Sequence, residues 1–367
     1  MATSALRTTA MLQALERARA AVPAVGELDP TLGGRFASRF DDLAGEVEDG
    51  LADGADPERA AELLQLGEDL IGETLAFLGG AAARKYALDF GVTSLADAWL
   101  DQLSDAMGLP RVGVVIPAST EFTGMLTHVV RLRLPSEGVW GLPVAVHEYG
   151  HFLASVFARR ELKDGLRVGV LAVEERLREA AQEHELPKLY LHGHELFADA
   201  VAAAVVGPAY VRHCIHDRFD PALAARPDVT HPAPVRRVRL QLKVLERIAA
   251  QDKTGYLPHA AATAGQEWRE RLAAAGVDPE PPADTLLDPL EDELVELLDD
   301  PTLKKVRYSD QRAAQALALE LLEPGAEADS AAVALNAAWV RRLDHGTPLD
   351  EITAACERLV RGALGRG

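Results

Sequence analysis

Residues 141–160, GLPVAVHEYGHFLASVFARR, join an apolar helical pattern to a pair of histidines. Apolar side chains recur at the spacing of one helix face, and Pro143 suits a first helical turn, where its missing N–H costs no hydrogen bond. We therefore expect a largely buried helix. It carries His147 and His151, four positions apart, with Glu148 directly after the first histidine.

This spacing gives the two histidines a common direction. Residues four apart lie one helical turn apart on the same face, so the imidazoles of His147 and His151 can reach one point, as zinc ligation requires. Glu148 points about 100° around the helix, where it can act as a general base without binding the metal. Chance can also produce this pattern, but burying three such side chains on an apolar helix without partners would be costly.

A catalytic zinc ion takes three protein ligands and keeps a fourth position open. The segment 192–202, HGHELFADAVA, places Glu195 and Asp199 four positions apart, among alanines that permit close helix packing. We expect Glu195 to be the third ligand and Asp199 to accept a hydrogen bond from the second nitrogen of a histidine ligand. Two alternatives stay open: Asp199 could bind the metal itself, or Glu195 could only face the positive end of a helix that begins near it.

Other histidines are rival ligands. We place two of them on a glycine-broken segment before the helix that carries Glu195, and two after the stop that Gly207 and Pro208 impose on that helix. These rivals are His192, His194, His213 and His216.

The composition of the 367 residues indicates a folded, mainly helical protein, with 48% hydrophobic residues and few aromatic ones. A net charge of −19, from 38 basic and 57 acidic residues, argues against a nucleic-acid partner. Cys214 and Cys356 are the only cysteines and lie far apart, which favours a reducing compartment. No secretory signal and no membrane span is evident, so we expect a cytoplasmic protein.

Three regions follow along the chain: a helical N-terminal region over residues 1–107, a core over 108–255 and a helical C-terminal region over 256–367. The strongest strand patterns lie in the core, at residues 111–118 and 128–136. We therefore expect a mainly α protein with a small β-sheet.

Three segments of the core resemble a known family. HEYGH (147–151), ELFAD (195–199) and THPAPVRRV (230–238) are similar to gluzincin metallopeptidases of the CAAX prenyl protease and heat-shock membrane protease type. The resemblance covers roughly residues 128–245. It implies a zincin-like α+β core flanked by helical regions, a bound Zn²⁺ and hydrolysis of a protein or peptide substrate. The best-known members have transmembrane helices, so this chain would be a soluble version.

The resemblance also implies roles for particular residues. His147, His151 and Glu195 would bind zinc, and Glu148 would be the base. His231 would correspond to the histidine that stabilises the transition state, and Arg237 to the arginine that accompanies it. The position of the family's aspartate near the metal is taken here by Asp199.

Several alternatives remain for these roles. His231 could be only a turn residue before a proline, Arg237 a solvated helix residue or ion pair, and Tyr210 a rival donor to the oxyanion. Zincins usually pair an extended substrate with an edge strand beside the active helix, and residues 128–136 are the expected strand. Arg131 and Arg133 would then favour acidic substrate residues.

The sequence supports a zinc-dependent endopeptidase, which could be a hydrolase specific for one cytoplasmic protein. A function of another class is a non-catalytic, zincin-derived binding or regulatory protein that works through its helical flanks. The presence of Glu148 favours the enzyme, because a structural metal site does not need a base.

Overall fold

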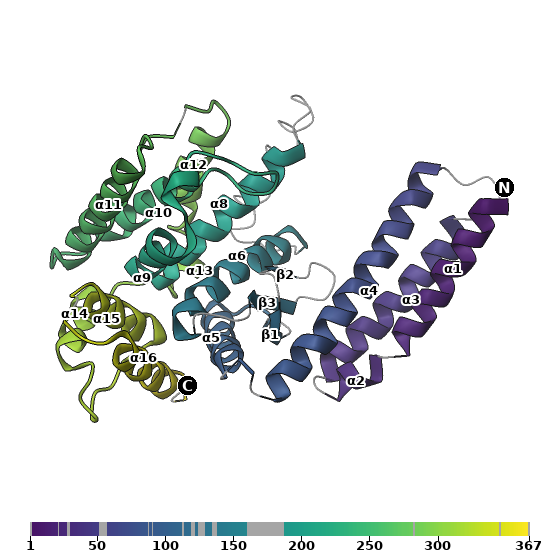
Figure 1. Cartoon of the computed structure of the whole chain (residues 1–367), viewed down its shortest axis with the longest axis horizontal. Coiled ribbons are helices and arrows are strands. Elements are labelled where there is room, and N and C mark those ends of the chain that lie inside the picture. The colour runs from purple at the N-terminus through teal and green to yellow at the C-terminus, as the bar shows by residue number, and fades with distance from the viewer. Residues whose placement is uncertain are drawn as a thin grey trace. The chain divides into compact units, whose positions relative to one another are not determined.

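The chain is mainly helical, as its composition predicts (Figure 1). The computed structural model describes residues 2–20, 22–27, 30–50, 57–86, 88–89, 91–111, 114–118, 122–123, 129–133, 138–159, 187–281, 283–344 and 346–365. The chain divides into two compact units. One contains residues 1–93 and 112–135, and the other contains residues 94–111 and 136–367.

The first unit contains α1 (Ala2–Arg19), α2 (Val22–Gly26), α3 (Pro30–Gly50) and α4 (Pro57–Lys85). α3 packs against α1 and α4. Aromatic and aliphatic side chains on the facing surfaces form a buried core, which includes Phe36, Phe40, Leu43, Leu70 and Phe77. These helices make up most of the helical region expected over residues 1–107.

Three short strands belong to the same unit: β1 (Val114–Ala118), β2 (Phe122–Thr123) and β3 (Val129–Arg133). β3 is the middle strand, parallel to β1 and antiparallel to β2. At Val130 and Arg131, where β3 is paired on both sides, the predicted free edge for substrate is therefore absent; residues 128 and 134–136 lie outside the described residues. The burial of alternate residues, Val130 and Leu132, identifies a strand but does not separate a middle strand from an edge.

The boundaries of the units differ from the three regions that we expected. Residues 112–135 join the N-terminal helices because β1 packs on α4. Arg84 of α4 donates a hydrogen bond to the Val115 carbonyl oxygen (2.9 Å), and a side chain at Gly80 would collide with Ile116 and Pro117. The helices after residue 256 join the second unit, because α11 (Tyr256–Ala275) and α12 (Leu287–Leu297) pack on α10 (Pro234–Ala249).

The second unit begins with α5 (Val92–Met107), whose first two residues lie in the first unit. The elements that carry the candidate site are α6 (Leu142–Arg159), α8 (Pro187–Val206), α9 (Pro208–His213) and α10. Among the described residues, no helix has both the length and the apolar character that a bilayer span requires. The remaining elements are η1 (Gly138–Gly141), η2 (Cys214–Arg218), η3 (Pro221–Leu223), α13 (Pro301–Lys304), α14 (Gln311–Glu320), α15 (Ala331–Leu343) and α16 (Leu349–Leu364).

α6 confirms the helix predicted over residues 141–160, with Pro143 in its first turn. It packs against α8 (Figure 1), and the two backbones come closest at Gly150 and Ala198. A Cβ atom at Gly150 would lie 2.6 Å from the Ala198 Cα, closer than packed atoms allow. Glycine and alanine therefore set the separation of these helices.

α8 begins at Pro187, eight residues before Glu195, and not near Glu195 as we expected. Gly193 lies inside this helix, where a glycine costs only about 1 kcal/mol and packing can outweigh it. Glu195 therefore lies in the interior of α8, which excludes the alternative that it serves the helix N-terminus.

The predicted stop after α8 is confirmed. Gly207 has a φ of 75°, a left-handed conformation that glycine adopts without strain, and α9 begins at Pro208. A Cβ atom at Gly207 would also collide with the Tyr308 ring. The turn directs α9 back toward α6 and α8, with which it is in contact.

We expect Gly150→Ala to lower the free energy of unfolding by about 1–3 kcal/mol, because the added methyl group must push α6 and α8 apart. Gly362→Ala in α16 is the matched control, since Gly362 is exposed and a Cβ atom there meets open space. That change should be neutral or stabilising by up to about 1 kcal/mol. Urea unfolding of the metal-free proteins measures both, and equal effects would contradict the close helix contact.

Candidate metal centre

α6 and α8 bring two imidazoles and one carboxylate together. His147 Nε2 lies 3.4 Å from Glu195 Oε2, and His151 Nε2 lies 3.2 Å from Glu195 Oε1. A tetrahedral ion with bonds of about 2.0–2.1 Å separates its ligand atoms by roughly 3.3 Å. Each imidazole nitrogen therefore stands at the spacing of two ligand atoms of one ion from an oxygen of Glu195.

The Glu195 carboxylate gives a second indication of a bound cation. Its Oε2 atom is buried and has no hydrogen-bond partner. His147 Nε2 and Arg237 Nη2, at 3.4 and 3.2 Å, approach it only as charged neighbours. A buried carboxylate oxygen without a hydrogen bond is costly, and a metal ion bound between the two helices would satisfy it. The side chains present therefore fit a metal ion with nitrogen and oxygen ligands.

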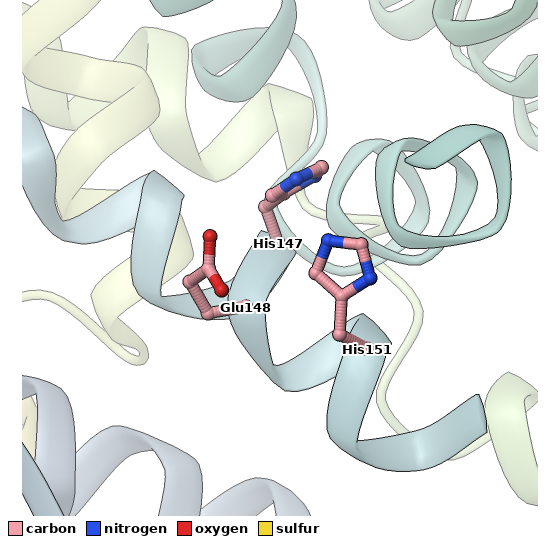
Figure 2. Close-up of side chains that lie close together, drawn as sticks. All are labelled: His147, Glu148 and His151. Atoms are coloured by element: carbon pink, nitrogen blue, oxygen red, sulfur yellow. The ribbon is translucent and has the colours of Figure 1, made fainter. Parts of the chain in front are cut away.

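Glu148 belongs to the same cluster but has a different position. Ligand atoms of His147, Glu148 and His151 all lie within 4.8 Å of one another. Figure 2 shows the two imidazole rings together on α6 and the Glu148 carboxylate to one side of them. We assign the third ligand to Glu195, because its two oxygens lie 3.2–3.4 Å from the two imidazole nitrogens. Glu148 is then a buried carboxylate beside the centre.

The other nitrogen of His147 faces a buried polar group. Its Nδ1 atom lies 3.2 Å from Asp199 Oδ1 and 3.1 Å from the Tyr210 hydroxyl. Tyr210 in turn donates a hydrogen bond to Asp199 Oδ1 at 2.5 Å. Asp199 therefore lies on the side of His147 away from Glu195, as expected for an aspartate that orients a ligand and not for a ligand itself.

Arg237 links both carboxylates of α8. Its Nε and Nη2 atoms donate to the two Asp199 oxygens, at 2.6 and 2.9 Å, and Nη2 also lies 3.2 Å from Glu195 Oε2. The guanidinium is buried and stacks over the Phe219 ring, 5.2 Å from its centroid. Arg237 is thus an ion pair inside the protein, and the alternative of a solvated helix arginine is wrong.

These contacts shift the titration of the centre. Burial alone would raise the pKa of Glu195, but Arg237 and the two imidazoles outweigh it and hold that pKa far below its usual range. Burial likewise opposes ionisation of Asp199, yet Arg237 and His147 lower its pKa. Burial alone would lower the pKa of His147, but the nearby carboxylates of Asp199 and Glu195 raise the pKa to about 9. Without a metal ion, His147 is therefore a cation between two carboxylates at neutral pH.

His231 faces the centre from the solvent side. Its Nε2 atom lies 3.5 Å from Glu195 Oε1. Asp228 orients the ring: one of its oxygens accepts the backbone N–H groups of Thr230 and His231, and both lie 3.2 Å from His231 Nδ1. The Thr230 hydroxyl lies 2.7 Å from the same nitrogen. The structure thus places His231 beside Glu195, at the more exposed side of the cluster.

Tyr210 does not reach the open side of the centre. Its hydroxyl is buried between Asp199 and His147 Nδ1, behind the imidazole. The alternative in which Tyr210 contacts an oxyanion on the Nε2 side is therefore not supported by its position.

The four rival histidines differ from His147 and His151 in their surroundings. His194 directly precedes Glu195 on α8, so its side chain leaves the helix about 100° away from that of Glu195. The other three have separate partners: His192 Nε2 lies 3.1 Å from the Asp228 carbonyl oxygen, His213 Nδ1 lies 3.5 Å from Asp217 Oδ2, and His216 Nε2 lies 3.0 Å from Glu267 Oε2.

Sequence reasoning missed four residues of the site. Asp228 and Thr230 could have been found, since an aspartate two residues before a threonine is a frequent side-chain turn. Gly150 could have been noted as the small residue between the two histidines. Phe219 gave no signal, because nothing local relates it to Arg237.

Compared with models of protein families, with curated proteins and with solved structures, the chain matches none of them. The family resemblance therefore rests on three short segments. What the structure adds is the geometry of their side chains.

We predict that the apparent zinc affinity rises up to tenfold per pH unit between pH 6.5 and 9 and then levels off, because zinc must displace the proton of His147. The stability of the metal-free protein should instead decrease over the same pH range. The raised pKa contributes stability that is fully present below about pH 6.5 and is lost as the pH rises through 9.

Competition with a chelator at each pH measures this affinity, and calorimetry in two buffers measures the protons released. Thermal unfolding with and without zinc should show a widening gap toward pH 9. A zinc affinity that stays constant between pH 7 and 9 would contradict the protonation assigned to His147.

Proposed function

We propose that the protein is a zinc-dependent endopeptidase. The observation that carries this proposal is the convergence of two imidazoles and one carboxylate, at 3.2–3.4 Å, beside the buried carboxylate of Glu148. Two histidine nitrogens with one carboxylate oxygen are a donor set typical of catalytic zinc, which leaves a fourth position open. When bound, zinc acidifies water and polarises a carbonyl oxygen.

The burial of the side chains indicates the side from which substrate enters. The exposed fraction is 1% for the His147 side chain, 12% for Glu195, 17% for His151 and 39% for His231. Solvent therefore approaches from the side of His151 and His231, whereas His147 lies on the buried side of the centre. We infer that a peptide carbonyl lies on this open side, next to His151 and His231.

Glu148 is suited to accept a proton there. Its carboxylate lies within 4.8 Å of a ligand atom of each imidazole, whereas Glu195 makes the contacts of 3.2–3.4 Å with both of them. A general base has to lie within hydrogen-bond reach of its proton, directly or through one water molecule. Its burial strengthens its electrostatic interaction with the reacting atoms.

His231 is suited to donate to the oxygen on which negative charge develops. Its Nδ1 atom is engaged by Asp228 and Thr230, which fixes the ring with Nε2 3.5 Å from Glu195 Oε1, on the more exposed side of the centre. A donor held in place before the reaction stabilises such an oxygen without further reorganisation. Tyr210 lies behind His147 and cannot take this role without a rearrangement.

The peptide bond as substrate rests on the family resemblance. HEYGH, ELFAD and THPAPVRRV contribute the metal ligands, the base and the oxyanion donor, in the order found in gluzincins of the CAAX prenyl protease and heat-shock membrane protease type. A zincin-like core is part of the same proposal. The cytoplasmic location and the absence of a nucleic-acid partner remain expectations from composition and charge.

Glu148→Gln should keep zinc affinity within about threefold of the parent but lower kcat at least about 100-fold, since general base catalysis typically contributes 10²–10⁴-fold. Glu270→Gln, an exposed glutamate on α11, is the control and should leave both unchanged. Peptide-library hydrolysis with metal analysis of each protein measures the outcome. Full activity of Glu148→Gln would show that Glu148 is not the general base. A parent that holds zinc and cleaves no peptide would favour the non-catalytic binding protein.

His231→Gln should bind zinc like the parent, with kcat reduced about 10²–10³-fold and KM little changed, because its donor acts only on the developing charge. His259→Gln, at an exposed position on α11, is the control. Steady-state kinetics on a cleaved peptide separates kcat from KM. Unchanged kcat in His231→Gln would show that another group holds the oxyanion.

A further inference from the structure

We infer that Tyr210 is a positioning residue for the metal centre, which fixes the protonated nitrogen of His147 and thereby directs the opposite nitrogen at the ion. This inference rests on the metal site of the proposed function. It assigns to Tyr210 a role on the buried side of the site, in place of the oxyanion contact.

The argument starts from the single hydrogen of the Tyr210 hydroxyl. Its oxygen lies 2.5 Å from Asp199 Oδ1, a carboxylate oxygen that can only accept, so the phenolic hydrogen belongs to that contact. The same oxygen lies 3.1 Å from His147 Nδ1. Having given its hydrogen to Asp199, Tyr210 can only accept from His147. The proton of the neutral imidazole must then be on Nδ1.

This assignment determines which nitrogen can bind a metal ion. With its proton on Nδ1, neutral His147 carries its free electron pair on Nε2, the atom that lies 3.4 Å from Glu195. Asp199 alone would leave His147 some freedom to turn, since its Oδ1 atom lies 3.2 Å from Nδ1. Tyr210 adds a second acceptor for the same N–H group, and its ring lies nearly parallel to the imidazole, with 18° between the planes.

Tyr210 also completes the partners of Asp199. Arg237 donates to both carboxylate oxygens, and Tyr210 adds a donor to Oδ1. Removing the hydroxyl would leave Oδ1 with Arg237 and His147 alone, and the carboxylate could shift toward the guanidinium. The effect would pass to His147, which depends on that oxygen for its orientation.

The fold holds Tyr210 in place through the break between α8 and α9. The left-handed Gly207 ends α8, and the Tyr210 N–H donates to the Gly207 carbonyl oxygen at 3.1 Å. Asn336 of α15 receives the Ala209 N–H on its side-chain oxygen at 2.9 Å. Buried polar contacts therefore anchor the start of α9, and the hydroxyl of Tyr210 is held under His147.

Tyr210→Phe tests the inference because it removes only the hydroxyl. We expect the dissociation constant for zinc to rise about 10–100-fold, and the visible absorption bands of the Co²⁺-loaded protein to shift. Tyr308→Phe is the matched control: its hydroxyl is also buried and bonded, to Gln311 Oε1 at 3.0 Å, but the tyrosine contacts neither His147 nor Asp199 in that bond. It should bind zinc and Co²⁺ like the parent.

A measurement on the unaltered chain keeps the test valid should Tyr210→Phe fail to fold. Nitrogen-15 NMR of the zinc-loaded protein should show His147 with its proton on Nδ1 and in slow exchange with water. Ligation through Nδ1, with the proton on Nε2, would overturn the inference, as would parental zinc affinity and an unshifted Co²⁺ spectrum in Tyr210→Phe.

The two proposals fail separately. A parent that binds zinc but hydrolyses no peptide would defeat the peptidase and leave the role of Tyr210 standing. A Tyr210→Phe protein that binds zinc like the parent would defeat the positioning role and leave the peptidase standing. A parent that does not bind zinc would overturn both.

Discussion

The contact between Gly150 on α6 and Ala198 on α8 is the constraint on which the candidate site depends. Gly150 lies between Glu148 and His151, and Ala198 directly precedes Asp199. Because these backbones touch, the imidazoles of one helix and the carboxylates of the other are within 3.2–3.4 Å. A larger residue at either position would separate groups that must converge on one point.

Charge is the second constraint, and it explains why the site favours a cation. Glu195 and Asp199 are both ionised and almost fully enclosed, and Arg237 supplies only one of the two positive charges that they require. In the metal-free protein the second charge is the proton on His147, whose pKa is raised to about 9. A divalent ion would replace that proton and bring a larger charge to the same place. The proton on His147 and a metal ion therefore compete to neutralise the same two carboxylates.

The sequence was sufficient to predict those features of the fold that depend only on neighbouring residues. The helix of the histidine pair follows from its apolar spacing, and the stop after α8 follows from Gly207 and Pro208, since no other residues end a helix so reliably. The assignment of Glu195 needed more: the four-residue spacing to Asp199 marked one helix face, and the neighbouring alanines suggested that this face packs closely.

Tertiary contacts account for the predictions that failed. Gly193 was taken as a break, but α8 continues through it because packing outweighs a weak local preference. For Arg237 the sequence left open a solvated residue or an ion pair, because the two carboxylates that it contacts lie 38 and 42 positions earlier in the chain. The sequence pattern at 128–136 alternates like that of an edge strand, and only the pairing of β3 with β1 and β2 places β3 in the middle.

The most direct test of the central claim is the position of zinc in crystals of the full chain, located by anomalous diffraction at the zinc absorption edge. The structure predicts one strong peak between α6 and α8, about 2.0–2.2 Å from His147 Nε2, His151 Nε2 and a Glu195 oxygen, with Glu148 outside bonding distance. Zinc bound by Glu148 in place of Glu195, or no zinc between these helices, would contradict it.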